Sequence, residues 1–270
     1  MKIIGLPALV GSYDNYIWVL YQNQQAWVVD PGESEQVLAF LQQQGLQLQG
    51  VLITHFHHDH VSGIGALKDA FPQAKVYGPE LTPDPLIEVR LKESDRITLT
   101  DDFALNVLFT PGHTEDHISY YNDDALFCGD TLFSAGCGRK FTGTFAHFTD
   151  SILKLRALPD NLNFYSAHEY TQSNLKFAYL VEPGNAALRQ RILNTRILYP
   201  EPLEGPQSTL GEEKATNPFL RFDQPAIKAQ LLQRGALDTA ESLFKTLREW
   251  KDDLDQSGAL DQMDLQESVK

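Results

Sequence analysis

Cysteine and long apolar stretches are both scarce in this chain of 270 residues. Cys128 and Cys137 are its only cysteines, and no C-x-x-C pair is present, which excludes a disulfide scaffold and fits a reducing compartment. Residues 1–11 contain one lysine and a short apolar stretch broken by Pro7, so we expect a first strand there and not a signal peptide. Since no apolar stretch is long enough to span a bilayer, we expect a cytoplasmic protein without a membrane partner.

Basic residues are scarce as well. The chain has 22 Lys and Arg against 36 Asp and Glu, a formal net charge of −14, which repels phosphate backbones. A nucleic-acid partner is therefore not expected. Part of the acidic excess lies near the end of the chain, where it predicts a solvated, partly frayed tail. The acidic residues of this tail are Asp252, Asp253, Asp255, Asp261, Asp264 and Glu267.

The order of the apolar patterns predicts an α+β protein. Residues 1–170 alternate short β-rich segments with a few helical ones, and residues 171–270 have an almost wholly helical pattern, so we expect two domains that meet near residue 170. The expected strands are Tyr16 to Tyr21, Ala26 to Val29, Gly50 to Ile53, Ala74 to Tyr77, Phe103 to Phe109, Ile118 to Tyr121 and Ala125 to Cys128. The expected helices are Ser34 to Gln44, Ser62 to Phe71, Thr171 to Val181, Asn185 to Leu198, Gln224 to Gln233 and Thr239 to Leu254.

A cluster of possible metal ligands follows the apolar strand Val51 to Ile53. Residues 54–60 read THFHHDH, and a loop at the end of a strand can aim alternate side chains inward. We therefore expect His55 and His57 to face one metal, and Asp59 and His60 to face a second one. Three further donors each follow an apolar stretch: His113 in T-P-G-H-T, Asp130 in F-C-G-D-T and His168 in S-A-H-E-Y.

The other polar residues near these motifs are expected to have simpler roles. His58 should point away from the first metal by alternation with His57, and His147 lies in a polar turn, so neither is expected to be a ligand. His117 is expected to be structural, with a role next to the ligands as the lesser alternative. Asp30 is expected to bind local backbone, again with a role near the metals as the lesser alternative. Surface positions are expected for Glu33, Asp101, Asp102 and Asp124.

These motifs, in this order over about residues 10–170, resemble those of the metallo-β-lactamase superfamily. The resemblance implies a four-layered αββα sandwich, followed here by a C-terminal helical domain. It also implies two divalent metals at one edge of the sheets, most simply zinc, with iron or manganese as alternatives. The implied ligands are His55, His57 and His113 for the first metal and Asp59, His60 and His168 for the second, with Asp130 between both.

Finer motifs resemble those of the glyoxalase II (hydroxyacylglutathione hydrolase) family. They are T-L-F-S-A-G-C-G-R-K-F-T-G-T at 131–144, A-H-E-Y-T at 167–171, N-P-F-L-R at 217–221 and R-x-x-K-D at 248–252. The resemblance implies a monomer whose helical domain, residues 171–270, binds the glutathione part of the substrate. The implied contacts are Arg139, Tyr170, Arg248 and Lys251, together with the backbone near Lys140 and Phe141. Cationic forks and a phenol suit the two carboxylates of glutathione.

The expected reaction is hydrolysis of S-(2-hydroxyacyl)glutathione, chiefly S-D-lactoylglutathione, to D-lactate and glutathione. A hydroxide between the two metals would attack the thioester carbon, and the catalytic residues would be Asp59, which orients this hydroxide, and Asp130. Asp116 and Phe141 depart from the family pattern, which has a small residue and often a tyrosine there, and they put affinity and metal preference in question.

Other functions stay open at this point. A persulfide dioxygenase of the same fold would use one iron, and the second ligand set and the Arg248 and Lys251 motif argue against it. A lactonase is a further alternative. A nuclease conflicts with the charge of −14, and a flavodiiron-type electron carrier usually has a glutamate where His57 stands. A non-catalytic binding protein would be expected to have lost ligands, and none is missing here.

Overall fold

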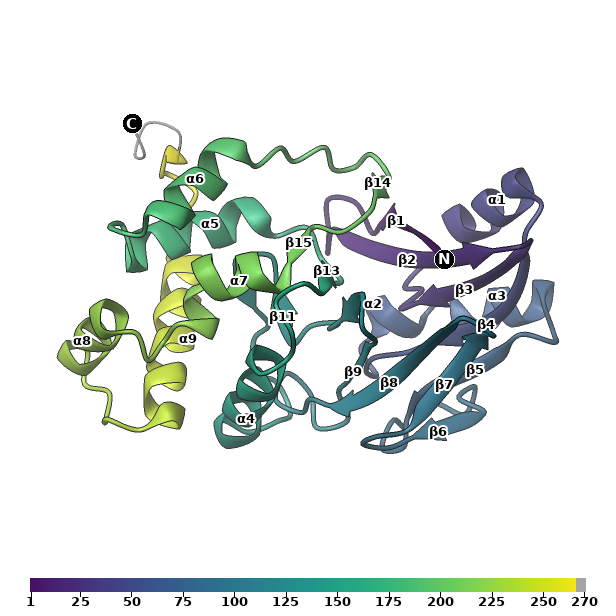
Figure 1. Ribbon diagram of the computed structural model, residues 1–270, viewed down its shortest axis with the longest axis horizontal. Helices are drawn as coiled ribbons and strands as arrows, with labels where there is room; N and C mark the ends of the chain where they lie inside the picture. Colours follow the sequence, from purple (N-terminus) through teal and green to yellow (C-terminus); the bar gives the residue numbers. More distant parts are fainter. Residues whose placement is uncertain (266–270) are drawn as a thin grey trace.

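Two β-sheets packed face to face form the centre of the fold in the computed structural model, which describes residues 1–265 (Figure 1). In sheet order, the first sheet contains β14 (Leu203–Glu204), β1 (Lys2–Ala8), β2 (Asn15–Gln22), β3 (Gln25–Val29), β4 (Gln47–Leu52), β5 (Lys75–Pro79) and β6 (Val89–Leu91). The second contains β15 (Ser208–Thr209), β13 (Asn163–Tyr165), β10 (Ala125–Phe127), β9 (Ile118–Tyr121), β8 (Phe103–Phe109) and β7 (Arg96–Thr100). A small hairpin, β11 (Leu132–Phe133) and β12 (Gly136–Cys137), lies outside both.

Both faces of the first sheet are buried, which explains the nearly continuous apolar run of β2. Ile17 and Val19 point towards the helices α1 (Glu35–Gln44) and α3 (Ile64–Ala70) and share one core cluster with them. Trp18 and Leu20 point the other way, into the cluster between the two sheets. Because side chains alternate along the strand, β2 contributes to two apolar cores, one on each face of the sheet.

A third apolar cluster covers the outer face of the second sheet. It joins Leu126 of β10 and Phe164 of β13 to α4 (Phe145–Arg156) and to the C-terminal helices. The layers are therefore helix, sheet, sheet and helix, and the predicted αββα sandwich with a C-terminal helical region is confirmed. The C-terminal helices lie together beside this sandwich (Figure 1). They are α5 (Thr171–Val181), α6 (Ala186–Asn194), α7 (Leu210–Thr216), the 3-10 helix Pro218–Leu220, α8 (Pro225–Gln233) and α9 (Ala240–Ser257).

Several elements differ from the sequence prediction. Helix α4 was not predicted, although its buried Phe148, Ile152 and Leu155 recur at helical spacing and the hydroxyl of Thr144 caps its first turn. Helix α6 was expected to reach Leu198 and ends at Asn194, because the chain then extends and returns to the two sheets as β14 and β15. The described part of the chain after residue 170 is therefore not almost wholly helical, since it also contributes two short strands to the sheets.

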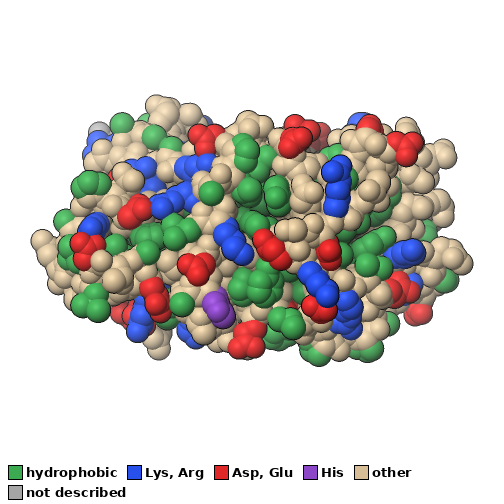
Figure 2. All heavy atoms as spheres, turned by 60° about the horizontal axis from the view of Figure 1, so that its bottom comes forward, with side chains coloured by type: hydrophobic (Ala, Val, Ile, Leu, Met, Phe, Trp, Pro, Cys, Tyr) green, Lys and Arg blue, Asp and Glu red, His purple; other side chains and the backbone are tan. Residues whose placement is uncertain are grey.

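The expected acidic tail is partly wrong. Helix α9 runs on to Ser257, so Asp252 and Asp255 lie inside it and form ion pairs with Arg139 and Arg248. Glu267, the last acidic residue assigned to this tail, lies outside the described residues. On the face shown in Figure 2, acidic and basic side chains are interspersed over most of the surface. Within residues 1–265, no helix is long and apolar enough to cross a membrane.

Candidate metal centre

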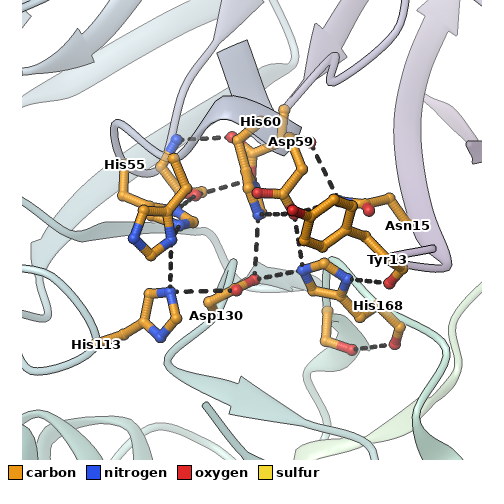
Figure 3. Close-up of polar contacts among 12 residues, drawn as sticks. Tyr13, Asn15, His55, Asp59, His60, His113, Asp130 and His168 are labelled. Carbon is orange, nitrogen blue, oxygen red and sulfur yellow. Dashed lines mark hydrogen bonds and ion pairs between the residues drawn. The ribbon is translucent and has the colours of Figure 1, made fainter. Parts of the chain in front are cut away.

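All seven expected metal ligands meet where strands of the two sheets end, and Figure 3 labels all of them except His57. His55 and His57 follow β4 of the first sheet directly, and Asp59 and His60 lie in the short helix α2 (His58–Val61) that comes next. The turns after β8, β10 and β13 of the second sheet bring in His113, Asp130 and His168. The short helix was not predicted, and it turns Asp59 and His60 towards the same point.

The first donor set consists of three imidazoles and one carboxylate. The Nδ1 atom of His57 lies 3.0 Å from Nε2 of His55 and 2.9 Å from Nε2 of His113. Asp130 completes the set, with Oδ2 3.3 Å from Nε2 of His113. Donor atoms this close repel one another or share a single proton unless a cation lies between them, so this geometry fits a metal site.

The second donor set lies on the other side of Asp130. Nε2 of His60 is 3.3 Å from Oδ2 of Asp59, and Nε2 of His168 is 3.5 Å from the same oxygen. The second carboxylate oxygen of Asp130, Oδ1, lies 3.1 Å from Nε2 of His168 and 3.4 Å from Nε2 of His60. Asp130 thus directs one oxygen at each set, as Figure 3 shows.

Outer contacts orient the imidazole rings. Nδ1 of His113 bonds the carbonyl of Arg139 at 2.7 Å, and Nδ1 of His168 bonds the carbonyl of Tyr13 at 2.8 Å. A carbonyl only accepts, so each of these Nδ1 atoms carries the proton and each Nε2 lone pair points inward. Nδ1 of His60 lies 3.1 Å from a carboxylate oxygen of Asp30, which has the same effect.

Burial and neighbouring charges set the protonation states. Burial lowers the pKa of His113 to about 4. For Asp130, burial acts to raise the pKa, but His168, His60 and His113 together hold it well below its usual range. Nε2 of His60 and Oδ1 of Asp130 are buried and have no hydrogen-bond partner among the described residues. At His60 burial acts to lower the pKa, but Asp130, Asp30 and Asp59 together raise it well above its usual range. Carboxylates that favour a positive charge at this place and unsatisfied inward atoms are what a cation pair requires, so the residues present fit two metal ions.

One of the simpler roles expected from sequence was wrong, and another was right. Asp30 does not use its carboxylate for local backbone: it accepts from the amide and hydroxyl of Thr54 at 2.8 and 2.7 Å and contacts His60, so the lesser alternative holds. His117 is buried and accepts from the amide of Asp130 at 3.0 Å, so its structural role is to fix that residue's backbone. His58 and His147 are exposed, as expected for non-ligands.

Gly129 allows this arrangement. Its φ of 47° lies in the left-handed region, and a Cβ atom there would come within 2.5 Å of the Thr54 hydroxyl and 2.7 Å of Nε2 of His117. A larger residue before Asp130 would displace the Thr54 hydroxyl, which bonds Asp30, and the His117 ring, which bonds the amide of Asp130.

Asn15 is a positioning residue that the sequence reading missed. It is buried at the start of β2, and its amide nitrogen donates to the carboxylate and to the carbonyl of Asp59, both at 3.1 Å. Asn15 precedes Asp59 by 44 residues, and an isolated asparagine in an apolar strand carries no motif. The one available signal was a polar residue at the start of an otherwise apolar strand.

Replacing Asn15 by alanine is expected to lower metal affinity at the second set about ten- to hundredfold, as loss of an outer partner of a metal ligand does. Measuring metal content after dialysis against graded chelator concentrations checks this. The matched control is Asn161→Ala, since Asn161 is exposed and donates to the carbonyl of Asp123. Equal metal retention in both variants would remove the role assigned to Asn15.

A cleft of about 400 Å³ opens from the donor sets towards α9. It is lined by five of the six residues expected to bind substrate: Arg139, Phe141, Tyr170, Arg248 and Lys251. Lys140 does not line it; its Nζ atom lies 3.4 Å from the carbonyls of Phe141 and Gly143. Tyr13, Cys137, Asn174 and Asp255 also line the cleft and were not expected.

Asp116, one of the two departures from the family pattern, is buried beside the cleft wall. It accepts from the hydroxyl of Thr114 at 2.6 Å and from the hydroxyl of Thr82, and burial raises its pKa. It thus ties the loop that contains Thr82 to the turn that carries His113. Phe141, the other departure, stacks edge-on against His57 and His113 with ring centroids 5.1 and 5.0 Å apart.

The chain is similar to known proteins over most of its length. The model of the metallo-beta-lactamase superfamily matches residues 11–168, and the model of the hydroxyacylglutathione hydrolase C-terminus matches residues 169–254. The hydroxyacylglutathione hydrolase of Aeromonas hydrophila is 47% identical over 253 residues, which cover 93% of this chain and 98% of the relative. That of Hydrogenovibrio crunogenus is 40% identical over 267 residues, which cover 97% and 98%.

Among solved structures, ETHE1 from Myxococcus xanthus has a TM-score of 0.62 and 26% identity, over 93% of this chain and 98% of that one. The chain is therefore a metallo-beta-lactamase-fold hydrolase. Within that superfamily it belongs to the hydroxyacylglutathione hydrolase family, as the resemblance of its motifs predicted.

Proposed function

We propose that this chain hydrolyses the thioester of S-(2-hydroxyacyl)glutathione, chiefly S-D-lactoylglutathione, to D-lactate and glutathione. The observation that carries the proposal is the cleft itself, which joins both donor sets to the cationic side chains of Arg248 and Lys251. A thioester without charged groups could not form ion pairs with these cations, whereas the two carboxylates of glutathione could. The name of the relatives at 40% and 47% identity supports the same reaction.

The proposed ligands are His55, His57 and His113 for one divalent ion and Asp59, His60 and His168 for the other, with Asp130 shared. Imidazoles and carboxylates favour zinc, and iron or manganese would also suit them. Bound there, two such ions would supply a deprotonated water at neutral pH and polarise the thioester carbonyl. The convergent, unsatisfied Nε2 and carboxylate atoms support this assignment.

We assign the catalytic roles to Asp59 and Asp130, and each is held by a residue outside the donor sets. Asn15 donates to Asp59, so its free carboxylate oxygen can accept a hydrogen bond from the attacking water and orient it. His117 accepts from the amide of Asp130 and keeps its two oxygens aimed at both donor sets. Little acid catalysis is needed on the leaving side, since a thiolate departs readily.

Residues of both parts of the chain would bind the glutathione moiety. We assign the catalytic domain to residues 1–170 and the substrate-binding domain to residues 171–270. Supporting this, Arg139 and Tyr170 meet Arg248 and Lys251 of α9 in the same cleft. Tyr170 stacks on His168 with ring centroids 4.8 Å apart and donates its hydroxyl to the carbonyl of Tyr13. The side chain of Lys140 has no place in this proposal, and only its backbone stays near the cleft.

The second donor set favours the thioesterase over a persulfide dioxygenase, which would need one iron. Asp59, His60 and His168 are all present, buried and convergent. A lactonase could use the same two sets, but the cationic side chains of α9 would then have no function.

The test is an assay of purified protein of known metal content against S-D-lactoylglutathione, a lactone and glutathione persulfide. Turnover of the first, at least a hundredfold above the other two in kcat/KM, is expected. The proposal fails if S-D-lactoylglutathione is not hydrolysed while either of the others is turned over. We also propose that the enzyme is cytoplasmic and monomeric. The free thiols of the buried Cys128 and Cys137 support the cytoplasmic location.

A further inference from the structure

One wall of the cleft carries three cations and two carboxylates in mutual contact. The cations are Arg139, Arg248 and Lys251, and the carboxylates are Asp252 and Asp255. Oδ1 of Asp252 lies 3.2 Å from Nε of Arg139 and 3.2 Å from Nη2 of Arg248. Asp252 does not line the cleft, whereas Asp255 does.

Asp255 contacts all three cations at once. Its oxygens lie 2.8 and 3.0 Å from Nζ of Lys251, and Oδ2 is 3.4 Å from Nη2 of Arg139 and 3.6 Å from Nη2 of Arg248. The Asp255 side chain is 19% exposed and those of Arg248 and Lys251 are 2% and 6% exposed, so water screens these two contacts only weakly. The Arg139 side chain is 55% exposed, and its contact with Asp255 is screened more. Both oxygens of Asp255 are therefore already engaged by the groups that a substrate carboxylate would need.

The position of Asp255 is costly without these cations. It lies in the last turn of α9, where the helix dipole disfavours a negative charge. Burial and the neighbouring Arg248 lower the pKa of Lys251, and Asp255 opposes that shift. The Asp255 carboxylate thus stabilises the packed cations, and the cations stabilise it, while no substrate is bound.

We propose that Asp255 is an internal counter-ion that competes with a carboxylate of the glutathione moiety for Lys251 and Arg139, and so sets the affinity of the cleft for its substrate. This inference rests on the proposed function. The three cations, Asp252 and Asp255 have a net charge of +1 together, whereas without Asp255 it would be +2. A carboxylate ligand therefore has to take over contacts that Asp255 makes. The competing group lies on the same helix as two of the cations, four residues after Lys251.

The experiment compares wild-type protein, Asp255→Asn and Asp253→Asn. Both variants lose one negative charge from α9, but Asp253 is exposed and does not line the cleft. Calorimetry with glutathione is expected to give about a tenfold lower Kd for Asp255→Asn than for the other two, since a competing charge a few ångströms away is removed. KM for S-D-lactoylglutathione should fall to a similar extent without a rise in kcat. Asp255→Ser, which also removes the charge, should behave alike.

A neutral truncated thioester, S-lactoyl-N-acetylcysteamine, separates competition from general effects. It has no carboxylate, so its kcat/KM should be the same in Asp255→Asn and wild-type protein. Unchanged glutathione affinity in Asp255→Asn overturns the inference. Weaker affinity overturns it too, because it would mean that Asp255 binds the ammonium group of glutathione. If wild-type protein neither binds glutathione nor hydrolyses its thioester, the proposed function fails as well.

Discussion

Replacing Asp130 by asparagine is expected to lower kcat/KM for S-D-lactoylglutathione by about a thousandfold or more and to lower the bound metal below two ions per chain. The substitution keeps the shape of the side chain, but it replaces one inward oxygen by an N–H donor that faces Nε2 of His113 or of His168. One donor set loses its shared ligand whichever way the amide turns. A loss of several kcal/mol of charge stabilisation corresponds to this factor.

Steady-state kinetics and elemental analysis of the same preparation check this prediction. Asp101→Asn is the matched control, because Asp101 is exposed in the turn between β7 and β8 and should leave both quantities unchanged. Retention of two metals with near-normal turnover in Asp130→Asn would show that the carboxylate is not shared. Loss of turnover with unchanged metal content would mean that Asp130 orients the attacking water and is not needed to hold the metals.

The ligand positions could be predicted because each one is anchored by the local sequence. Four of the seven lie within residues 55–60 after a strongly apolar strand, and His113, Asp130 and His168 each follow another apolar stretch. Strand ends of two packed sheets meet at one edge, so donors placed there come together without any further information. This is why the residues expected around the metals are the ones that the structure brings together.

Contacts between distant segments could not be predicted in the same way. Asn15 meets Asp59 across 44 residues, and Asp255 meets Arg139 across 116 residues. All four are ordinary polar residues. Packing within the sandwich brings Asn15 to Asp59, and packing of α9 on the sandwich brings Asp255 to Arg139. The prediction of a frayed tail was wrong for Asp252 and Asp255 because acidic residues at the end of a helix look solvated until the cations opposite them are known.

The helical part also determines how the hairpin of β11 and β12, between Asp130 and Arg139, is held. Asn217 of the N-P-F-L-R motif donates to the carbonyls of Phe133 and Gly136 at 3.2 and 2.9 Å. Glu213 accepts from the amide of Ala135 at 2.9 Å, and this alanine has a φ of 57°. A strained turn of this kind persists only where its surroundings fix it.

Glu213→Ala is therefore expected to destabilise the protein by about 3 to 5 kcal/mol. Glu213 is fully buried and bonds Nη2 of Arg191, which is 5% exposed and also bonds Ser134 at 2.9 Å. Removing the carboxylate leaves the buried guanidinium with only the more distant Glu212 as a charge partner, along with two unsatisfied donors, the amide of Ala135 and the hydroxyl of Ser208. A shift in the midpoint of urea unfolding, followed by circular dichroism, measures the effect.

The neighbouring residue provides the control. Glu212 is 44% exposed and lies 3.7 Å from Nε of Arg191, so Glu212→Ala should cost less than about 1 kcal/mol. Arg191→Ala combined with Glu213→Ala should cost less than the sum of the two single substitutions, since each removes the same pair. Under conditions where Glu213→Ala stays folded, turnover should still fall, because the freed hairpin connects Asp130 to Arg139. A variant that loses stability but keeps full activity would mean that the pair supports the fold alone.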